Sequence, residues 1–154
     1  MSVPEGYLID TNILLRLTRP QDSQHQLVKS ALTALDQEGQ EFYVSIQNMA
    51  EYWNVSTRPI ERNGYGLPNA GIIEGVEEIE RTMVLLPETI QVYPIWRQLV
   101  ITHAVRGVQV HDARLVAIML AYGLTRILTL NTGDFERFPE IAPLHPSQVP
   151  AKSV

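Results

Sequence analysis

The chain has 154 residues, a formal net charge of −5, 45% hydrophobic and 19% charged residues, and no cysteine. This composition is typical of one folded domain with a sizeable core, and it excludes a disordered chain. The lack of cysteine excludes disulfides and thiolate metal sites, and the negative charge argues against binding nucleic acid through a broad basic surface. We expect a single domain over residues 1–154.

The first residues show neither a basic segment nor the long apolar run of a signal peptide. No apolar run approaches the roughly 18 residues that a membrane span requires. We therefore expect a cytoplasmic protein without a membrane partner.

Apolar periodicity predicts strands and helices that alternate along the chain. Strands are predicted at 6–10, 42–45, 83–86 and 126–130, with a last edge strand near 142–144. Helices are predicted at 12–18, 23–39, 47–57, 70–81, 90–106 and 113–122, with a glycine-rich loop at 59–71. Strands that alternate with helices normally form a parallel sheet covered on both faces, so we predict a three-layer α/β/α sandwich.

Asp10 stands between two apolar segments, where the first predicted strand meets the first helix. Its carboxylate would lie at the carboxyl end of a buried strand, where open α/β sheets bind ligands. A buried carboxylate without a partner is costly, and a metal ion would remove that cost. The alternative is an ordinary helix cap, a role that Thr11 or Asn12 could fill equally well.

Glu51 lies on the helix that follows the second strand. The first turns of this helix are therefore expected near the carboxyl edge of the sheet, where Asp10 is predicted to lie. Two rows run along this helix, each with helical spacing. The polar row is Gln47, Glu51, Asn54 and Arg58, and the apolar row is Ile46, Met49, Ala50 and Trp53. The alternative for Glu51 is a position on a solvated helix face.

Two further acids accompany the later elements. Asp112 opens a largely apolar helix, whose N-terminus stabilises negative charge, although Asp112 could also be a simple N-cap. Its neighbour His111 should point elsewhere and is expected to be structural. Asp134 follows the strand at 126–130, in a turn where aspartate is also common for local reasons.

These acids are expected to converge, because the carboxyl ends of parallel strands share one edge of the sheet. Carboxylates and waters hold hard cations such as Mg²⁺ or Mn²⁺. Such an ion can activate water and neutralise charge on a phosphodiester. We predict a catalytic metal site formed by Asp10, Glu51, Asp112 and Asp134. Candidates for phosphate contact are Arg16, Arg19, Arg58 and Arg114.

Four short motifs follow one another along the chain. They are Asp10-Thr11-Asn12 after an apolar run, Asn48-Met49-Ala50-Glu51, His111-Asp112-Ala113, and the segment 128–135 that ends in Gly133-Asp134-Phe135. Together, over residues 7–138, they resemble the PIN-domain ribonucleases, in particular the VapC-like toxins of toxin–antitoxin pairs.

The resemblance implies an α/β/α sandwich with a parallel sheet and a Mg²⁺- or Mn²⁺-dependent endoribonuclease with an RNA substrate. It implies that Asp10 and Asp112 are the principal metal ligands. It also implies that Glu51 completes the site, directly or through water.

The same resemblance assigns supporting roles. Thr11 or Thr129 would orient ligands or water, and Asn12 would brace the turn after the first strand. The fourth position departs from the family, because many members carry an acid where Asn131 stands here. Either Asp134 completes the site or Asn131 does so as a neutral ligand, and the choice between one and two metals stays open.

VapC-like proteins usually form homodimers and bind an antitoxin whose C-terminal segment covers the acidic groove. The resemblance therefore implies a homodimer and a cognate antitoxin, and a basic arginine of that segment would suit acidic side chains.

Two alternatives remain. A phosphatase of the haloacid-dehalogenase type also begins with an aspartate at a strand end, but it needs a second aspartate where Asn12 stands. A non-catalytic PIN-like interaction domain would keep the fold without the activity.

Overall fold

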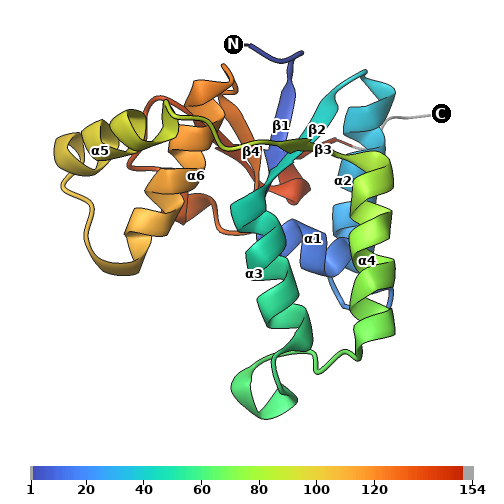
Figure 1. The fold of residues 1–154 in the computed structure, drawn as a ribbon. Coiled ribbons are helices and arrows are strands. Elements are labelled where there is room, and N and C mark those ends of the chain that lie inside the picture. Colours follow the sequence, from blue (N-terminus) through green and yellow to red (C-terminus); the bar gives the residue numbers. More distant parts are fainter. Residues whose placement is uncertain (1, 151–154) are drawn as a thin grey trace.

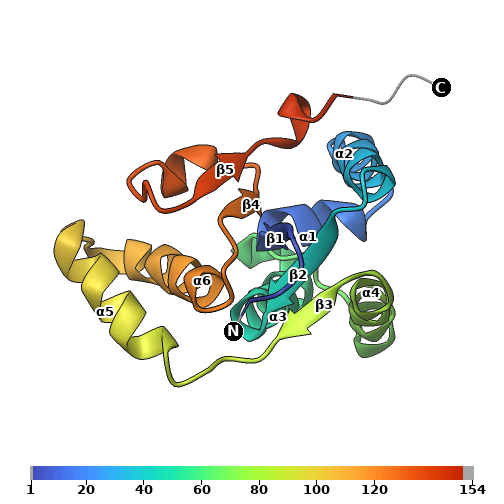
Figure 2. The ribbon, with the colours of Figure 1, turned by 90° about the horizontal axis from the view of Figure 1, so that it is seen from above.

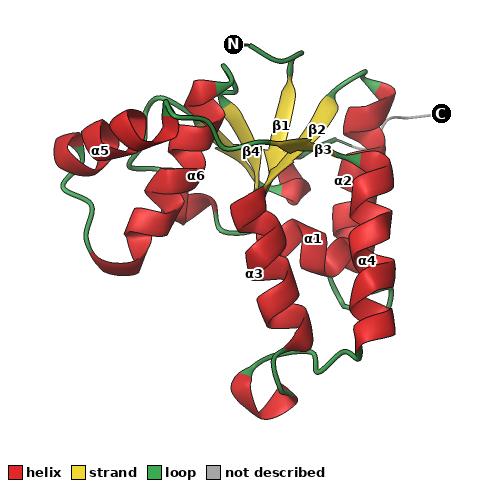
Figure 3. Cartoon of the chain, in the orientation of Figure 1, coloured by secondary structure: helices red, strands yellow, loops and turns green. Residues whose placement is uncertain are grey.

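The computed structural model describes residues 2–150, and its centre is a five-stranded, all-parallel sheet (Figure 3). The strand order is β3-β2-β1-β4-β5. The strands are β1 (Gly6–Ile9), β2 (Glu41–Ser45), β3 (Val84–Leu86), β4 (Arg126–Leu128) and β5 (Ala142–Leu144). The predicted α/β class is confirmed, and each predicted strand is present, including the last edge strand.

The helices surround this sheet (Figure 1). They are α1 (Thr11–Leu17), α2 (His25–Gln37), α3 (Ile46–Thr57), α4 (Asn69–Thr82), α5 (Val92–Thr102) and α6 (Val110–Ala121). Short 3₁₀ helices lie at Ile60–Arg62, Gly107–Gln109, Thr132–Phe135 and Pro146–Gln148. Among residues 2–150, no helix is both long enough and apolar enough to cross a membrane.

Helices cover both faces of the sheet, with α5 and α6 on one face and α1, α2 and α4 on the other (Figure 2). Successive strand residues point to opposite faces. Leu8 and Ile127 accordingly join the core under α5 and α6, whereas Ile9 and Leu128 join the core on the other side. Burial on both faces explains why the strands are continuous apolar runs rather than alternating ones.

The strand order reverses at β1, which pairs with β2 on one side and with β4 on the other. Ile9 lies opposite Leu128, so this register brings the next residues, Asp10 and Thr129, side by side. Such a reversal point is where open α/β sheets leave room for a ligand beyond the carboxyl ends of their strands. The fold therefore places Asp10 at the position predicted for it.

Helix α3 does not bury the face that its apolar periodicity predicts. Ile46 is 57% exposed and Trp53 is 40% exposed, although both belong to the apolar row. The buried residues of the helix are Gln47, Asn48, Tyr52 and Ser56. The reason is position: α3 extends beyond the sheet edge and packs on α1 and α4, not on a sheet face (Figure 1).

Two helix boundaries differ from the prediction by three residues or more. Helix α5 ends at Thr102 rather than at residue 106, because Ala104 adopts a left-handed conformation with φ 49°. Helix α6 begins at Val110 rather than at residue 113, because the 3₁₀ turn at Gly107–Gln109 leads directly into it. Asp112 therefore lies inside the first turn of α6.

Candidate functional site

Asp10 is held by neutral hydrogen-bond donors at the carboxyl end of β1. Its Oδ1 accepts a hydrogen bond from the Thr11 backbone N–H (2.8 Å). Its Oδ2 accepts from the Thr129 hydroxyl (2.8 Å) and from Asn12 Nδ2 (3.3 Å). The residue is 8% exposed and is the N-cap of α1. Asp10 thus caps the helix itself, and the expectation that Thr11 or Asn12 could cap it and leave Asp10 free is wrong.

Asn12 and Thr129 join the start of α1 to the segment after β4. Asn12 Nδ2 donates to Thr129 Oγ1 (3.2 Å), and Asn12 Oδ1 accepts from the Leu130 backbone N–H (3.0 Å). Thr129 is fully buried and also accepts from the Asn131 backbone N–H (3.0 Å). These bonds fix the Asp10 carboxylate relative to two neighbouring strands.

Glu51 is half-buried, and both of its carboxylate oxygens accept hydrogen bonds. Oε2 accepts from the Thr11 hydroxyl (2.9 Å), and Oε1 accepts from Gln47 Nε2 (3.2 Å). The Thr11 hydroxyl therefore joins the helix that carries Glu51 to the helix that Asp10 caps. The alternative of a solvated helix face does not hold for Glu51.

Buried polar residues that received no role from the sequence support Glu51. Ser45 is the N-cap of α3, and its side chain and that of Asn48 form a reciprocal capping box. Asn48 Nδ2 then donates to Thr11 Oγ1 (3.3 Å), the hydroxyl that binds Glu51. Ser45 and Asn48 are both fully buried. A serine between a strand and a helix, with a polar residue three positions later, is the sequence signal for such a cap.

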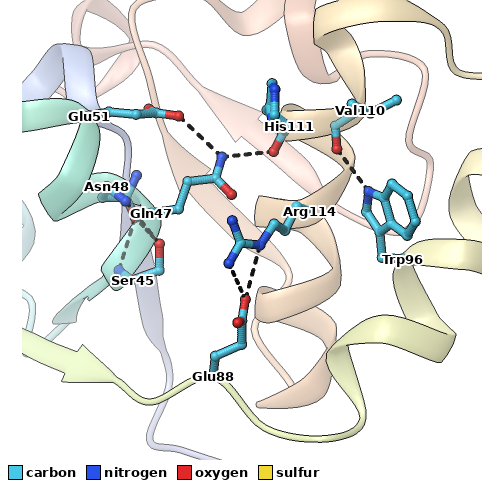
Figure 4. A network of polar contacts seen from close by, with 9 residues as sticks. All are labelled: Ser45, Gln47, Asn48, Glu51, Glu88, Trp96, Val110, His111 and Arg114. Atoms are coloured by element: carbon cyan, nitrogen blue, oxygen red, sulfur yellow. Dashed lines mark hydrogen bonds and ion pairs between the residues drawn. The ribbon is translucent and has the colours of Figure 1, made fainter. Parts of the chain in front are cut away.

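Asp112 lies in the first turn of α6 and is half-buried. It is not the N-cap, because Gln109 occupies that position and makes no side-chain capping bond. The side chain of the adjacent His111 is exposed, whereas its carbonyl accepts from Gln47 Nε2 (2.9 Å; Figure 4). The segment that carries Asp112 is thereby hydrogen-bonded to α3.

The pKa of Asp10 shows that the acids act on one another. This pKa is raised from 3.8 to about 6, and burial is the largest cause. The hydrogen bonds from Thr129 and Thr11 lower it, whereas the negative charges of Glu51 and Asp134 contribute to the rise. Asp10 therefore lies in the field of two of the other predicted site acids.

The pKa of Asp112 is raised further still, from 3.8 to about 7. Burial is the largest cause, followed by the charges of Asp134, Asp10 and Glu51, while Arg137 lowers the value. All four predicted acids are thus brought into one electrostatic cluster. Asp134, an exposed residue of the 3₁₀ helix at Thr132–Phe135, is the acid with the largest effect on Asp112.

The acidic side chains of this cluster lie farther apart than direct coordination of one ion by three of them would require. Within residues 2–150, no three acidic or histidine side chains are close enough together to hold a metal ion. No ion pair formed in this part of the chain involves the four acids, since the pairs are Arg16–Asp22, His103–Glu140, Arg114–Glu88 and Arg126–Glu5. An oxygen-only donor set that no ion pair neutralises fits Mg²⁺ or Mn²⁺, which retain water ligands.

The comparisons with known proteins identify the family of the chain. The family model of the PIN domain matches residues 7–141, a range that contains all four acids. The chain belongs to the PIN domain family. This membership does not support the alternative of a haloacid-dehalogenase-type phosphatase. No curated protein matches the sequence significantly.

Solved structures show the same fold for this PIN domain. FitAcB from Neisseria gonorrhoeae is similar with 22% identity and a TM-score of 0.62, over 92% of this chain and 98% of that one. VapBC2 from Rickettsia felis, bound to a promoter DNA fragment, has 15% identity and a TM-score of 0.65, over 90% and 97%. VapC20 from Mycobacterium tuberculosis, a sarcin–ricin loop cleaving toxin, has 15% identity and a TM-score of 0.58, over 79% and 87%.

The four arginines named as candidate phosphate contacts already interact within the PIN domain. Arg16 lies 4.0 Å from Asp22, and Arg114 donates to Glu88 at 2.8 and 3.0 Å. Arg19 stacks on the Tyr65 ring at 3.6 Å, and Arg58 donates to the Asn63 carbonyl (3.0 Å).

The raised pKa values predict that the metal-free PIN domain loses stability as the pH rises. Folded Asp112 keeps its proton up to about pH 7, whereas an aspartate in the unfolded chain releases it near 3.8. Between these values the folded state binds more protons, so the free energy of unfolding decreases with increasing pH. Asp112→Asn should raise that free energy by about 1–2 kcal/mol near pH 7.5, after allowance for partial exposure, and should change it little near pH 4.

Urea unfolding without divalent ions at the two pH values measures this effect. The matched control is Asp36→Asn, which changes an exposed acid of α2 that contributes to neither raised pKa. A loss of stability in Asp112→Asn near pH 7.5 would contradict the assigned electrostatics.

Proposed function

We propose that this PIN domain is a divalent-metal-dependent endoribonuclease that hydrolyses RNA phosphodiester bonds, and that it is the toxin of a toxin–antitoxin pair. The observation that carries the proposal is the cluster of four coupled acids at the strand-order reversal, with no ion pair to a protein cation within residues 2–150. Membership of the PIN family supports it. The similarity to VapC20, described as a sarcin–ricin loop cleaving toxin, supports the choice of RNA.

In this proposal Asp10 and Asp112 are the principal ligands of Mg²⁺ or Mn²⁺, and Glu51 completes the site directly or through water. Asp134 is preferred to Asn131 as the fourth member, because its charge has the largest electrostatic effect on Asp112. The bound ion would supply Lewis-acid activation of water and charge neutralisation at the phosphodiester.

The residues of the chain have separate tasks in this site. Thr129, Thr11 and Asn12 orient the Asp10 carboxylate with neutral donors, so its charge stays available for a cation. Thr11 orients Glu51 in the same way. The pKa values of about 6 for Asp10 and about 7 for Asp112 mean that both carboxyl groups keep their protons to a higher pH than an ordinary aspartate. Any proton still bound must leave when a cation binds.

Asp10→Asn should abolish RNA cleavage, because it removes a ligand charge while the amide keeps the shape of the side chain. We expect cleavage by the parent protein to require added Mg²⁺ or Mn²⁺ and to fall by about 100-fold or more in the variant. The measurement is single-turnover cleavage of a labelled RNA. Asp36→Asn is the matched control and should cleave like the parent. Equal cleavage by Asp10→Asn and the parent would indicate a contaminating nuclease and contradict the proposal.

The fourth member of the site can be tested by one substitution at each of the two candidate positions. Asp134→Asn should weaken Mn²⁺ binding by about tenfold, because it removes the negative charge that has the largest electrostatic effect on the pKa of Asp112. Asn131→Ala should have little effect, because the bond from Asn131 to Thr129 comes from its backbone N–H. Isothermal titration calorimetry with Mn²⁺ measures both. The reverse order of effects would assign the position to Asn131.

The toxin role is proposed from the solved structures, several of which are toxin–antitoxin complexes. We further propose that the chain forms a homodimer and binds a cognate antitoxin at the acidic site. The negative cluster would attract a basic side chain from such a partner.

Expression of the chain alone should arrest bacterial growth, and co-expression of the antitoxin gene expected beside it should restore growth. Asp10→Asn, produced at the same level, should not arrest growth, because the arrest depends on RNA cleavage. Growth curves with immunoblots of both proteins measure this. Arrest by Asp10→Asn would separate the toxicity from the proposed active site.

A further inference from the structure

Gln47 joins the two helices that carry Glu51 and Asp112. Its side chain is 7% exposed, in the first turn of α3. The single nitrogen Nε2 donates to Glu51 Oε1 (3.2 Å) and to the His111 carbonyl (2.9 Å), directly before Asp112 (Figure 4). One amide group therefore bonds to both sides of the candidate site.

The orientation of this amide is determined by its partners. A carboxylate and a carbonyl are both acceptors, so the NH₂ group must face them and the amide oxygen must face away. That oxygen is buried and has no hydrogen-bond partner within residues 2–150. A buried polar atom without a partner is unfavourable, and such exceptions call for an explanation.

We propose that Gln47 is a positioning residue that holds Glu51 at a fixed separation from Asp112, so that both can interact with one divalent cation. This inference rests on the proposed function. Gln47 holds one oxygen of Glu51 while Thr11 holds the other, and the bond to His111 ties the arrangement to α6. Without Gln47, the Oε1 atom loses its donor and the flexible Glu51 side chain regains rotamer freedom.

The neutrality of glutamine is what the site requires at this position. A lysine would also donate, but its charge would compete with the cation. A glutamate would offer only acceptors to Glu51 and to the His111 carbonyl, and it would repel Glu51. An asparagine is shorter by one methylene group. Glutamine fixes the carboxylate without neutralising it, and the unpaired oxygen is the consequence of presenting both N–H bonds to acceptors.

Calorimetric titration with Mn²⁺ and thermal unfolding of the metal-free protein test this role together. Gln47→Met keeps the length of the side chain and removes both donors and the unpaired oxygen. We expect Mn²⁺ to bind about tenfold more weakly, because loss of a residue that orients a ligand has an effect of this size. The midpoint of metal-free unfolding should stay within about 3 °C of the parent or rise. Gln47→Asn keeps the amide but shortens the side chain by one methylene group, so the amide no longer reaches Glu51 and the His111 carbonyl. This variant should show the same loss of Mn²⁺ affinity.

Coupling to Glu51 separates positioning from a general structural effect. In a Glu51→Gln background, adding Gln47→Met should change Mn²⁺ affinity less than twofold, because the group through which Gln47 acts has already been altered. The matched control is Gln98→Met, which removes an exposed glutamine of α5 whose Nε2 donates to Thr102 Oγ1 (2.8 Å). It should bind Mn²⁺ like the parent.

Each result has a distinct meaning. Parent-like Mn²⁺ affinity in Gln47→Met and Gln47→Asn overturns the positioning role and leaves the proposed function intact. A lower unfolding midpoint with unchanged affinity makes Gln47 a structural residue only, which also overturns it. A parent protein that neither binds Mn²⁺ nor cleaves RNA overturns the proposed function and this inference with it.

Discussion

Burial of the Asp10 carboxylate at the strand-order reversal is the constraint on which the rest of the structure depends. The pairing of β1 with β4 brings Thr129 beside it, and the start of α1 supplies Thr11 and Asn12 as further donors. These groups satisfy the oxygens but carry no positive charge. The carboxylate is therefore ordered without being neutralised, and its raised pKa records the remaining electrostatic cost.

The same arrangement recurs at Glu51, which accepts from Thr11 and Gln47, again neutral groups. Asn48 in turn holds the Thr11 hydroxyl, so one chain of hydrogen bonds joins α3 to α1. Fixed carboxylates that repel one another destabilise the metal-free fold. In the proposed function, a cation that binds only the folded state would offset this cost, so ion binding and stability would be linked. The neutral donors leave the carboxylates at this polar edge without a positive partner from the chain.

The sequence contained enough to predict the strands and the candidate acids. Asp10 ends one continuous apolar run and Asp134 follows another, and these runs predict the strands and the carboxyl edge of the sheet. Such signals can be recognised because they involve only residues that are adjacent in the sequence. The buried face of α3 could not be predicted in this way. Its apolar row would be buried only if the helix packed on a face of the sheet. The helix instead meets a polar edge, where Gln47 and Asn48 become buried through hydrogen bonds. Partners so distant in sequence leave no periodic signal.

The acidic character of the site also constrains how a polyanion such as RNA could bind there. Arg16 and Arg114 are paired with Asp22 and Glu88, so neither is a free counter-charge for phosphate. In the proposed function, Asp10, Glu51 and Asp112 would hold the divalent ion, and the ion would supply positive charge for the phosphodiester. Binding of the ion and binding of RNA are then coupled, and the coupling acts equally in both directions. In that proposal, an acidic chain acts on RNA without a broad basic surface, against which its net charge of −5 argues.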